Sequence, residues 1–528
     1  MTRDLYLRGD VRVEPLVCGW YAWPHLLAPM PLAFNIAFRY LPMLESFVAN
    51  PRVHAAAAQN PELLCGPFLP FGPEQQGEVR ALLARMQEEC AHLIRLAGAL
   101  RRLDQKLIDS ARGDSLRSLS DEIDPLLSGL VELVYDLNAQ PGIRLLEEML
   151  AAADVGGPAL EEICVARVAD RHRGFYLNTP RWETPHQRLL RIPFADRRID
   201  VLAQMRDSPC PEDKVVQDMQ PARGSLELER WFTTQAPRNR EQEYRGESVR
   251  VRYVGHACVL LQTRHVSIMV DPMIPYEDEV ADGRFTFADL PHHIDYLVIT
   301  HGHQDHCSPE TLLQLRHRVG TVLVPSTGSG SLADPSLKLL FRRLGFRDVR
   351  DLDPLDACEC AGGRIVSLPF FGEHADLDIC AKQCVYVSVE GRSILFFADS
   401  NVPAGACMGR LREHVGKVDS LFIGMECHGA PLTWMYGPYL TRPVARRHDE
   451  ARRLSGSNAA AAWRVIQGFD CSRAYVYAMG LEPWMRQLTG LSYTDASVQM
   501  TEARHFIERC HAAGVDAAVL QGSREWVL

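Results

Sequence analysis

The sequence predicts an α/β layered domain in the C-terminal half of the chain, preceded by a mainly helical N-terminal domain. From residue 249 onwards, short apolar and β-branched runs alternate with helical segments, as in sheets covered by helices. Residues 74–150 show mainly helical spacing of apolar side chains. The polar, turn-rich stretch 205–247 separates the two regions and reads as a linker or a wrapping segment. Because 528 residues exceed the size of one core, we expect two domains, at 1–245 and 246–528.

Three helices are expected in the N-terminal domain. The clearest covers residues 74–110, where apolar side chains recur at helical spacing. A second is expected from Asp124, a typical N-cap residue, to about residue 138, and a third over 143–150. No residue of this domain resembles a catalytic group. Partner binding, dimerisation or shaping of the entrance to a site elsewhere is therefore its expected role.

Strand and helix signals follow one another through the C-terminal domain. Each expected strand is a short apolar or alternating run, and the expected helices show apolar positions at helical spacing. The strands are expected at 249–254, 257–262, 266–270, 294–299, 321–325, 364–368, 384–389, 393–397, 418–423, 474–477 and 517–520, and the helices at 458–467 and 496–513.

Composition excludes several classes of protein. A net charge of −10 and a pI of about 6.0 argue against a general nucleic-acid binder. The N-terminus lacks the apolar core of a signal peptide, and no apolar run is long enough to predict a membrane span. The fifteen cysteines are scattered and include no CxxC pair, so we expect reduced thiols in a cytoplasmic protein.

A dense group of metal-ligand residues directly follows the apolar run at 294–299. The sequence there is Thr300-His301-Gly302-His303-Gln304-Asp305-His306. His301 and His303 can converge on one ion, and Asp305 and His306 on a second; imidazole and carboxylate suit zinc, iron or manganese. A histidine-rich surface turn is the less favoured alternative. This HxHxDH pattern resembles the signature of the metallo-β-lactamase fold, which implies an αββα sandwich.

Further ligands are expected after later strands. Asp399 ends an apolar strand and is the expected bridging ligand, a helix N-cap being the alternative. At the position where hydrolases of this fold carry a metal-binding histidine, this chain has Glu373 with His374 beside it, and we favour Glu373 as the ligand. A glutamate adds a hard oxygen donor and favours an ion that cycles between divalent and trivalent states, such as iron.

The last histidine of the fold's usual ligand set has no counterpart, because Met479-Gly480 occupies its place. One coordination position is therefore open, as binding of a small reactant such as O₂ requires, or is filled by another residue, for which Glu426 and His428 are candidates. Asp271 ends a strand and is expected to accept a hydrogen bond from a ligating histidine. We interpret His256 as a residue beside the ligands or facing substrate, and a structural histidine is nearly as well supported.

Two further groups have open interpretations. Aromatic residues near these motifs line an apolar pocket or belong to the core: Phe370, Phe371, Trp434 and Tyr436. A basic cluster either docks an acidic partner, which the family resemblance below implies to be a carrier protein, or is a solvated face, the second being favoured: Arg442, Arg446, Arg447, Arg452 and Arg453.

Over its whole length, the chain resembles the diiron β-hydroxylases of nonribosomal peptide antibiotic pathways. The motif at 301–306, Glu373 and the missing last histidine carry this resemblance. It implies two iron ions, O₂ as co-substrate and an external electron donor. It also implies β-hydroxylation of an amino acid, aromatic by analogy, tethered as a thioester to a carrier-protein domain of a nonribosomal peptide synthetase. The implied iron ligands are His301, His303, Asp305, His306, Glu373 and Asp399, with Glu373 and Asp399 as catalytic residues.

Two alternatives remain at this level. A dinuclear zinc hydrolase, such as a lactonase, thioesterase or phosphodiesterase, is favoured by the base rate of the fold and opposed by Glu373. A scaffold protein with a vestigial site is opposed by the intact motif and Asp399. Bound metal and turnover separate the three hypotheses.

Overall fold

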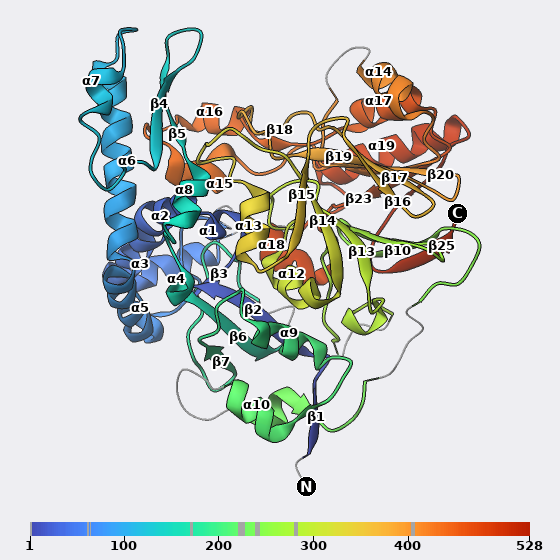
Figure 1. The fold of residues 1–528 in the computed structure, drawn as a ribbon, viewed down its shortest axis with the longest axis horizontal. Coiled ribbons are helices and arrows are strands. Elements are labelled where there is room, and N and C mark those ends of the chain that lie inside the picture. The colour runs from blue at the N-terminus through green and yellow to red at the C-terminus, as the bar shows by residue number, and fades with distance from the viewer. Residues whose placement is uncertain are drawn as a thin grey trace.

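Two seven-stranded sheets lie face to face in the C-terminal half of the chain (Figure 1). The computed structural model describes residues 3–60, 63, 65–168, 173–219, 227–237, 243–278, 283–402, 407–490 and 492–528. The first sheet has the order β15 (Asp348–Leu352), β14 (Val319–Pro325), β13 (Ile294–Val298), β12 (Ser267–Val270), β11 (Cys258–Gln262), β10 (Arg250–Gly255) and β25 (Arg524–Val527). From β12 to β15 its strands are parallel, and the others pair antiparallel.

The second sheet has the order β16 (Ala357–Cys360), β17 (Gly363–Pro369), β19 (Gln383–Val389), β20 (Arg392–Ala398), β21 (Ser420–Gly424), β23 (Arg473–Tyr477) and β24 (Asp516–Val519). From β20 to β24 its strands are parallel. In both sheets the parallel strands therefore end at a common edge, where loops can gather side chains from several strands.

The alternation of side chains explains the layers. In β20, Ile394 and Phe396 pack between the sheets, whereas Leu395 and Phe397 pack on the outer face. That outer face is covered by α14 (Cys407–Val415), α17 (Ala459–Phe469) and α19 (Val498–Ala512). The first sheet is covered by α12 (Pro309–Leu315), α13 (Leu337–Arg343) and the N-terminal domain. The expected αββα sandwich with a preceding domain is confirmed.

The N-terminal domain mixes helices with sheets, so the expectation of a mainly helical domain needs correction. A four-stranded sheet has the order β3 (Trp20–Tyr21), β2 (Val11–Val17), β6 (Glu161–Arg167) and β7 (Gln187–Leu190). The helix expected over 74–110 is divided at Cys90 into α5 (Gln76–Glu89) and α6 (Ala91–Ser110). Further helices of the described part of this domain include α1 (Pro24–Leu27), α2 (Pro29–Asn35), a π-helical turn at Ile36–Tyr40, α3 (Leu41–Ala49), α4 (Pro51–Ala58), α7 (Arg117–Ser120), α8 (Glu147–Ala152) and α9 (Arg197–Gln204).

The prediction of a helix over 124–138 is wrong. The helix predicted over 143–150 exists but begins later than expected. β4 (Val131–Tyr135) and β5 (Pro141–Leu145) form a hairpin there, and α8 begins only at Glu147. The β-branched and aromatic residues of β4 favour a strand, and Asp136 supplies the turn by accepting hydrogen bonds from the amides of Asn138 and Gln140. This local turn chemistry outweighs the N-cap signal of Asp124.

The described part of the stretch 205–247 wraps the N-terminal domain. Its strands β8 (Cys210–Pro211) and β9 (Phe232–Thr233) pair with β1 (Asp4–Leu7), and it also contains α10 (Glu212–Asp218) and α11 (Leu228–Trp231). Residues 220–226 and 238–242 of this stretch lie outside the described residues. Within the described residues, none of the helices combines the length and apolarity that crossing a bilayer requires.

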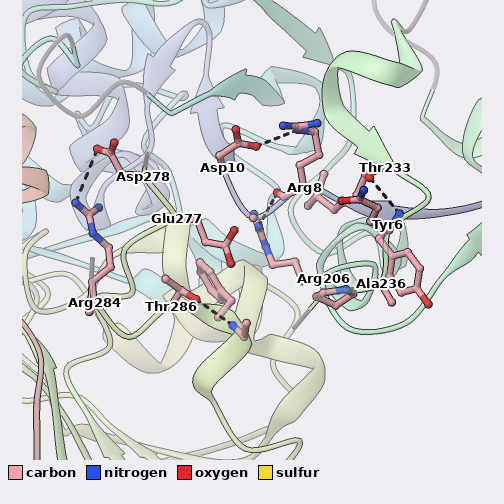
Figure 2. Close-up of a pocket in the computed structure, with 17 residues that line it drawn as sticks. Tyr6, Arg8, Asp10, Arg206, Thr233, Ala236, Glu277, Asp278, Arg284 and Thr286 are labelled. Carbon is pink, nitrogen blue, oxygen red and sulfur yellow. Dashed lines mark hydrogen bonds and ion pairs between the residues drawn. The ribbon is translucent and has the colours of Figure 1, made fainter. Parts of the chain in front are cut away.

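A cavity of about 490 Å³ opens between β1 and residues 277–278 and 283–288 (Figure 2). Two of its arginines are paired with carboxylates, since Arg8 lies 3.1 Å from Asp10 and Arg284 lies 3.8 Å from Asp278. Arg206 donates to Gln314 and to backbone carbonyls. This cavity contains none of the residues expected in the metal site.

Candidate metal centre

The six expected metal ligands meet at the edge where strands of both sheets end. The loop after β13 carries His301, His303, Asp305 and His306, while Asp399 directly follows β20. Oδ2 of Asp399 lies 3.2 Å from Nε2 of His306 and 3.8 Å from Nε2 of His301. Asp399 therefore lies between the two halves of the motif.

Glu373 reaches the same cluster from a short strand. It lies on β18 (Glu373–His374), which follows β17 and pairs with β22 (Leu454–Ser455). Its Oε1 is 3.6 Å from Nδ1 of His303, and its Oε2 is 2.7 Å from Nδ1 of His374. Geometry thus brings both Glu373 and His374 to the cluster and does not choose between them.

Hydrogen bonds beneath the cluster orient two histidine rings. Nδ1 of His306 donates to Oδ2 of Asp271 over 2.8 Å, and Nδ1 of His301 lies 2.9 Å from the hydroxyl of Thr300. That hydroxyl donates to Asp271 over 2.6 Å. With their Nδ1 atoms engaged, both rings direct the lone pair of Nε2 toward Asp399, as metal ligands require.

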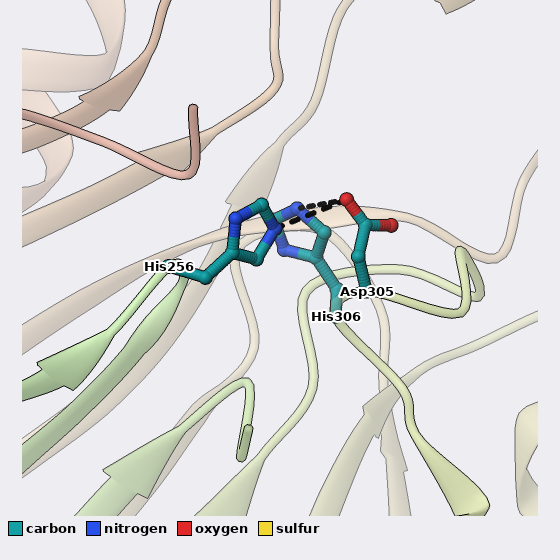
Figure 3. A group of neighbouring side chains, drawn as sticks. All are labelled: His256, Asp305 and His306. Atoms are coloured by element: carbon teal, nitrogen blue, oxygen red, sulfur yellow. Dashed lines mark hydrogen bonds and ion pairs between the residues drawn. The ribbon is translucent and has the colours of Figure 1, made fainter. Parts of the chain in front are cut away.

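His256 supports Asp305 and is not itself arranged as a ligand. Both His256 and His306 face Asp305 (Figure 3). Nδ1 of His256 accepts a hydrogen bond from the amide of Gly480 over 3.1 Å, so its proton resides on Nε2, which donates to Oδ2 of Asp305 over 3.0 Å. Metal binding at Nε2 would move the proton to Nδ1, where two N–H donors, that of His256 and that of the Gly480 amide, would then face each other. Gly480, which lies where the missing histidine would be, therefore fixes the tautomer and orientation of His256.

Unusual backbone conformations cluster around these side chains. The residues other than glycine with φ in the left-handed region include His256 (52°), Asp271 (45°), Glu373 (66°) and Ala398 (48°). Each lies at the end of a strand that leads into the cluster, or on the short strand β18. Such conformations cost free energy and accumulate at functional sites, where they aim side chains.

The donor atoms of the cluster fit bound metal ions. Within the described chain, several buried atoms of these residues have no hydrogen-bond partner: Nε2 of His301, Nε2 of His306 and Oδ1 of Asp399. Buried polar atoms in proteins are almost always paired. Imidazole nitrogens and carboxylate oxygens gathered in this way suit zinc, iron or manganese. The residues therefore fit a pair of such ions.

The charge balance of the cluster also favours cations. Burial raises the pKa of Glu373 to about 7 and that of Glu426 to about 8. Burial, with the neighbouring histidines, holds the pKa of His301 well below its usual range. Burial also opposes a charge on His306, but the carboxylates of Asp399, Asp271 and Asp305 outweigh it and raise its pKa. Carboxylates this deeply buried are stabilised by positive charge.

Of the two candidates for the free coordination position, only Glu426 lies in the cluster. It follows β21, lines the same cavity as Asp305 and Asp399, and accepts a hydrogen bond from the hydroxyl of Tyr493. His428 is exposed, and only its backbone carbonyl is engaged, by Gln499. Sequence reasoning missed Tyr493, since a single tyrosine in a loop carries no motif.

A cavity of about 60 Å³ lies against the carboxylates and has an aromatic and aliphatic wall. Trp434 belongs to this wall, together with Tyr176, Leu177, Met435 and Leu488. Of the other expected pocket residues, Phe370 packs against the ring of His301 at 5.3 Å and Phe371 packs in the core below the second sheet, while Tyr436 lines a neighbouring cavity. Sequence analysis missed Tyr176 and Leu177, which come from the N-terminal domain.

The N-terminal domain holds this wall in place through hydrogen bonds to the backbone of the helix that carries it. Trp434 and Met435 lie on α15 (Leu432–Tyr436), and Arg39 donates to their carbonyls over 2.9 and 3.0 Å. Nε1 of Trp434 donates to the carbonyl of Cys65 over 2.9 Å, and its ring stacks on Phe175 with centroids 5.1 Å apart. The shape of the cavity therefore depends on both domains.

Comparisons with known proteins agree with this geometry. Residues 6–237 match the family described as the diiron non-heme β-hydroxylase N-terminal domain, and residues 250–391 match the β-lactamase superfamily domain. The 4-amino-L-phenylalanyl-[CmlP-peptidyl-carrier-protein] 3-hydroxylase of Streptomyces venezuelae is 36% identical over 502 residues, which are 93% of each chain.

Solved structures give the same result. The crystal structure of CmlA, a diiron β-hydroxylase from Streptomyces venezuelae, matches with a TM-score of 0.91 and 34% identity over 100% of both chains. A mutant of that hydroxylase matches with a TM-score of 0.89 and 35% identity over 99% of this chain and 100% of the other. The agreement covers both domains, and the chain therefore belongs to the family of diiron non-heme β-hydroxylases.

Proposed function

We propose that the protein hydroxylates the β-carbon of an amino acid that is held as a thioester on a carrier-protein domain of a nonribosomal peptide synthetase. The observation that carries this proposal is the joining of Glu373, Asp399 and Glu426 with the 301–306 motif in one buried cluster. A relative 36% identical is named for 3-hydroxylation of a carrier-bound aminophenylalanyl group. Membership of the β-hydroxylase family disfavours the zinc hydrolase alternative.

The proposed ligands divide between two irons. His301, His303 and Glu373 would hold one iron, Asp305 and His306 would hold the second, and Asp399, which lies near His301 and His306, would serve both. Glu426 takes the position that the missing histidine leaves. Several hard carboxylate oxygens favour an ion that changes between divalent and trivalent states. When bound, the two irons supply the reaction of O₂ with the C–H bond, using two electrons from an external donor.

The protein's own part is positioning and exclusion of water. Trp434, Tyr176 and Leu488 form an apolar wall opposite the carboxylates, which suits an aromatic side chain of the substrate. A fixed wall holds the β-carbon at one distance from the ligand cluster and keeps bulk water out. The hydroxyl of Tyr493 donates to Glu426 and holds that carboxylate in place.

The carrier domain has a proposed docking surface beside this cavity. Arg442, Arg446 and Arg447 are exposed on and before α16 (Arg446–Ala451), where they can meet an acidic partner. Arg453 donates to the carbonyl of Gly429, a residue that lines the cavity, and so ties this segment to it. We further propose dimerisation through the N-terminal domain and, from the scattered free thiols, a cytoplasmic location.

Metal analysis combined with turnover tests the proposal. The purified protein is assayed for iron and zinc, and its optical spectrum is recorded before and after reduction and exposure to O₂. Carrier domains loaded with aromatic or aliphatic amino acids are then analysed by mass spectrometry for addition of one oxygen at the β-carbon. We expect two irons, a spectrum that responds to O₂ and hydroxylation of an aromatic substrate. Two zincs with thioester hydrolysis would contradict the proposal.

A further inference from the structure

A histidine of the N-terminal domain, His25, lines the same small cavity as His303 of the proposed metal cluster. His25 lies on α1 and is buried between Trp23 and Tyr439, with ring centroids 4.8 and 5.6 Å away. One ring nitrogen bonds to the carbonyl of Ala333. The other, Nδ1, is buried and has no partner in the described chain, so the nitrogen bonded to Ala333 is Nε2. Nδ1 is consequently a buried acceptor without a donor.

His303 presents the complementary atom. Its Nδ1 faces the cluster, 3.6 Å from Oε1 of Glu373. Its Nε2 is buried and has no partner among the described residues. When a histidine ligates through Nδ1, the proton resides on Nε2, and proteins almost always give that N–H an acceptor. Nε2 of His303 is therefore a buried donor that requires an acceptor.

A small cavity adjoins both rings. It measures about 20 Å³, and its lining includes His25, His303, His374 and Tyr436. Roughly 10–15 Å³ is enough for one water when two to four polar groups are available to bind it. The carboxylate of Asp334 also lines the cavity, but the amides of Cys380 and Ala381 and two hydroxyls already donate to it. Nδ1 of His374 lies 2.7 Å from Oε2 of Glu373, so the nitrogens of this lining that still need a partner are Nδ1 of His25 and Nε2 of His303.

We infer that one ordered water occupies this cavity, accepts a hydrogen bond from Nε2 of His303 and donates one to Nδ1 of His25. His25 thereby acts as a positioning residue for an iron ligand, and the N-terminal domain contributes to the metal centre itself. The inference rests on the proposed ligand role of His303 and not on the identity of the substrate.

Two amide substitutions at position 25 separate this role from a purely structural one. The side-chain amide of asparagine lies near the place of Nδ1, and that of glutamine near the place of Nε2. His25→Asn therefore keeps a group that can accept from the water, whereas His25→Gln keeps only the contact with Ala333. The inference expects His25→Gln to bind one of the two irons about tenfold more weakly in chelator competition and to change the optical spectrum, while His25→Asn stays near wild type.

Weaker iron binding by His25→Asn than by His25→Gln would show that His25 serves only to contact Ala333, and would overturn the inference. His303→Ala tests its premise, because retention of both irons by that variant would refute the ligand assignment instead. A crystal structure of the iron-loaded wild-type protein needs no variant to fold. We expect density for a water within hydrogen-bond distance of both nitrogens, and a cavity without such density would also overturn the inference.

Discussion

Asp271 and His306 form a buried pair at the ends of neighbouring strands, with Nδ1 of His306 donating to Oδ2 of Asp271 over 2.8 Å. Asp271→Asn keeps the shape of the side chain but removes the charge that supports the ring. We expect iron affinity to fall about tenfold, because groups that orient a ligating histidine typically contribute 10–100-fold. Chelator competition measures this change.

A matched control lies at the opposite ends of the strands. Asp419 accepts hydrogen bonds from the amide and hydroxyl of Ser393 at the start of β20, far along the strand from Asp399. Asp419→Asn removes a comparable charged acceptor there and leaves iron affinity unchanged. Equal losses in both variants would show that Asp271 matters only for folding.

Glu426 and His428 differ in burial, and their truncation should differ accordingly. Glu426→Ala removes a buried carboxylate that faces Asp399, so we expect lower iron content at one position and a changed optical spectrum. His428→Ala removes an exposed ring and serves as the control. Iron content and spectra of both variants test this expectation, which fails if Glu426→Ala retains two irons with the wild-type spectrum.

Replacing Glu373 by histidine should change metal preference. The variant exchanges a hard oxygen donor for imidazole, the ligand that hydrolases of this fold use at this position, so we expect zinc to compete better with iron. The backbone there has φ of 66°, a conformation in which histidine is among the better tolerated residues. Metal content after growth with equal iron and zinc measures the change, and an unaltered ratio would contradict it.

Trp434 is expected to act on substrate binding rather than on metal binding. Trp434→Ala removes the ring that lines the cavity and stacks on Phe175. Loss of this wall should raise KM for the loaded carrier domain about tenfold, roughly 1.4 kcal/mol, while the optical spectrum stays unchanged. Trp463, which contacts Arg509 on the covering helices, provides the control variant Trp463→Ala. A changed spectrum in Trp434→Ala would indicate that the ring also supports the metal centre.

Glu147 should make stability depend on pH. Burial raises the pKa of this carboxyl to about 7 in the folded protein, above its value of 4.5 in the unfolded chain. The folded state therefore favours the neutral form, and stability is lost as pH rises from about 4.5 through 7. Glu147→Gln keeps an oxygen for the amide of Ser336 and should raise Tm by about 2 °C at pH 8 but not at pH 4. Thermal unfolding at both values checks the sign.

Much of the site could be predicted because its ligands lie in short motifs next to apolar strands. The loop 301–306 needs only one strand end to assemble, and Asp399 needs one more. Choosing between Glu426 and His428 was not feasible from sequence, since both follow β21 and only the path of the chain turns Glu426 into the cavity and leaves His428 exposed. His25 and Tyr176 reach the site through packing of the two domains, which leaves no local pattern.

In the fold, too, some elements could be predicted from the sequence and others could not. Apolar runs such as β13 and β20 were located correctly because burial on both faces requires continuous hydrophobic sequence. β25 was missed because it is a short edge strand of mostly exposed residues that forms only by pairing with β10. In the N-terminal domain, the hairpin of β4 and β5 was missed because an aspartate before proline also signals a helix start.

The hydrogen bonds from Arg39 to the carbonyls of Trp434 and Met435 have a practical meaning for protein engineering. A hybrid gene that joins the first half of one relative to the second half of another would exchange part of the proposed substrate-facing wall without changing a proposed iron ligand. Such hybrids offer a route to altered amino acid preference. Conversely, the catalytic half expressed alone would lack that wall and leave the reactive centre open to solvent.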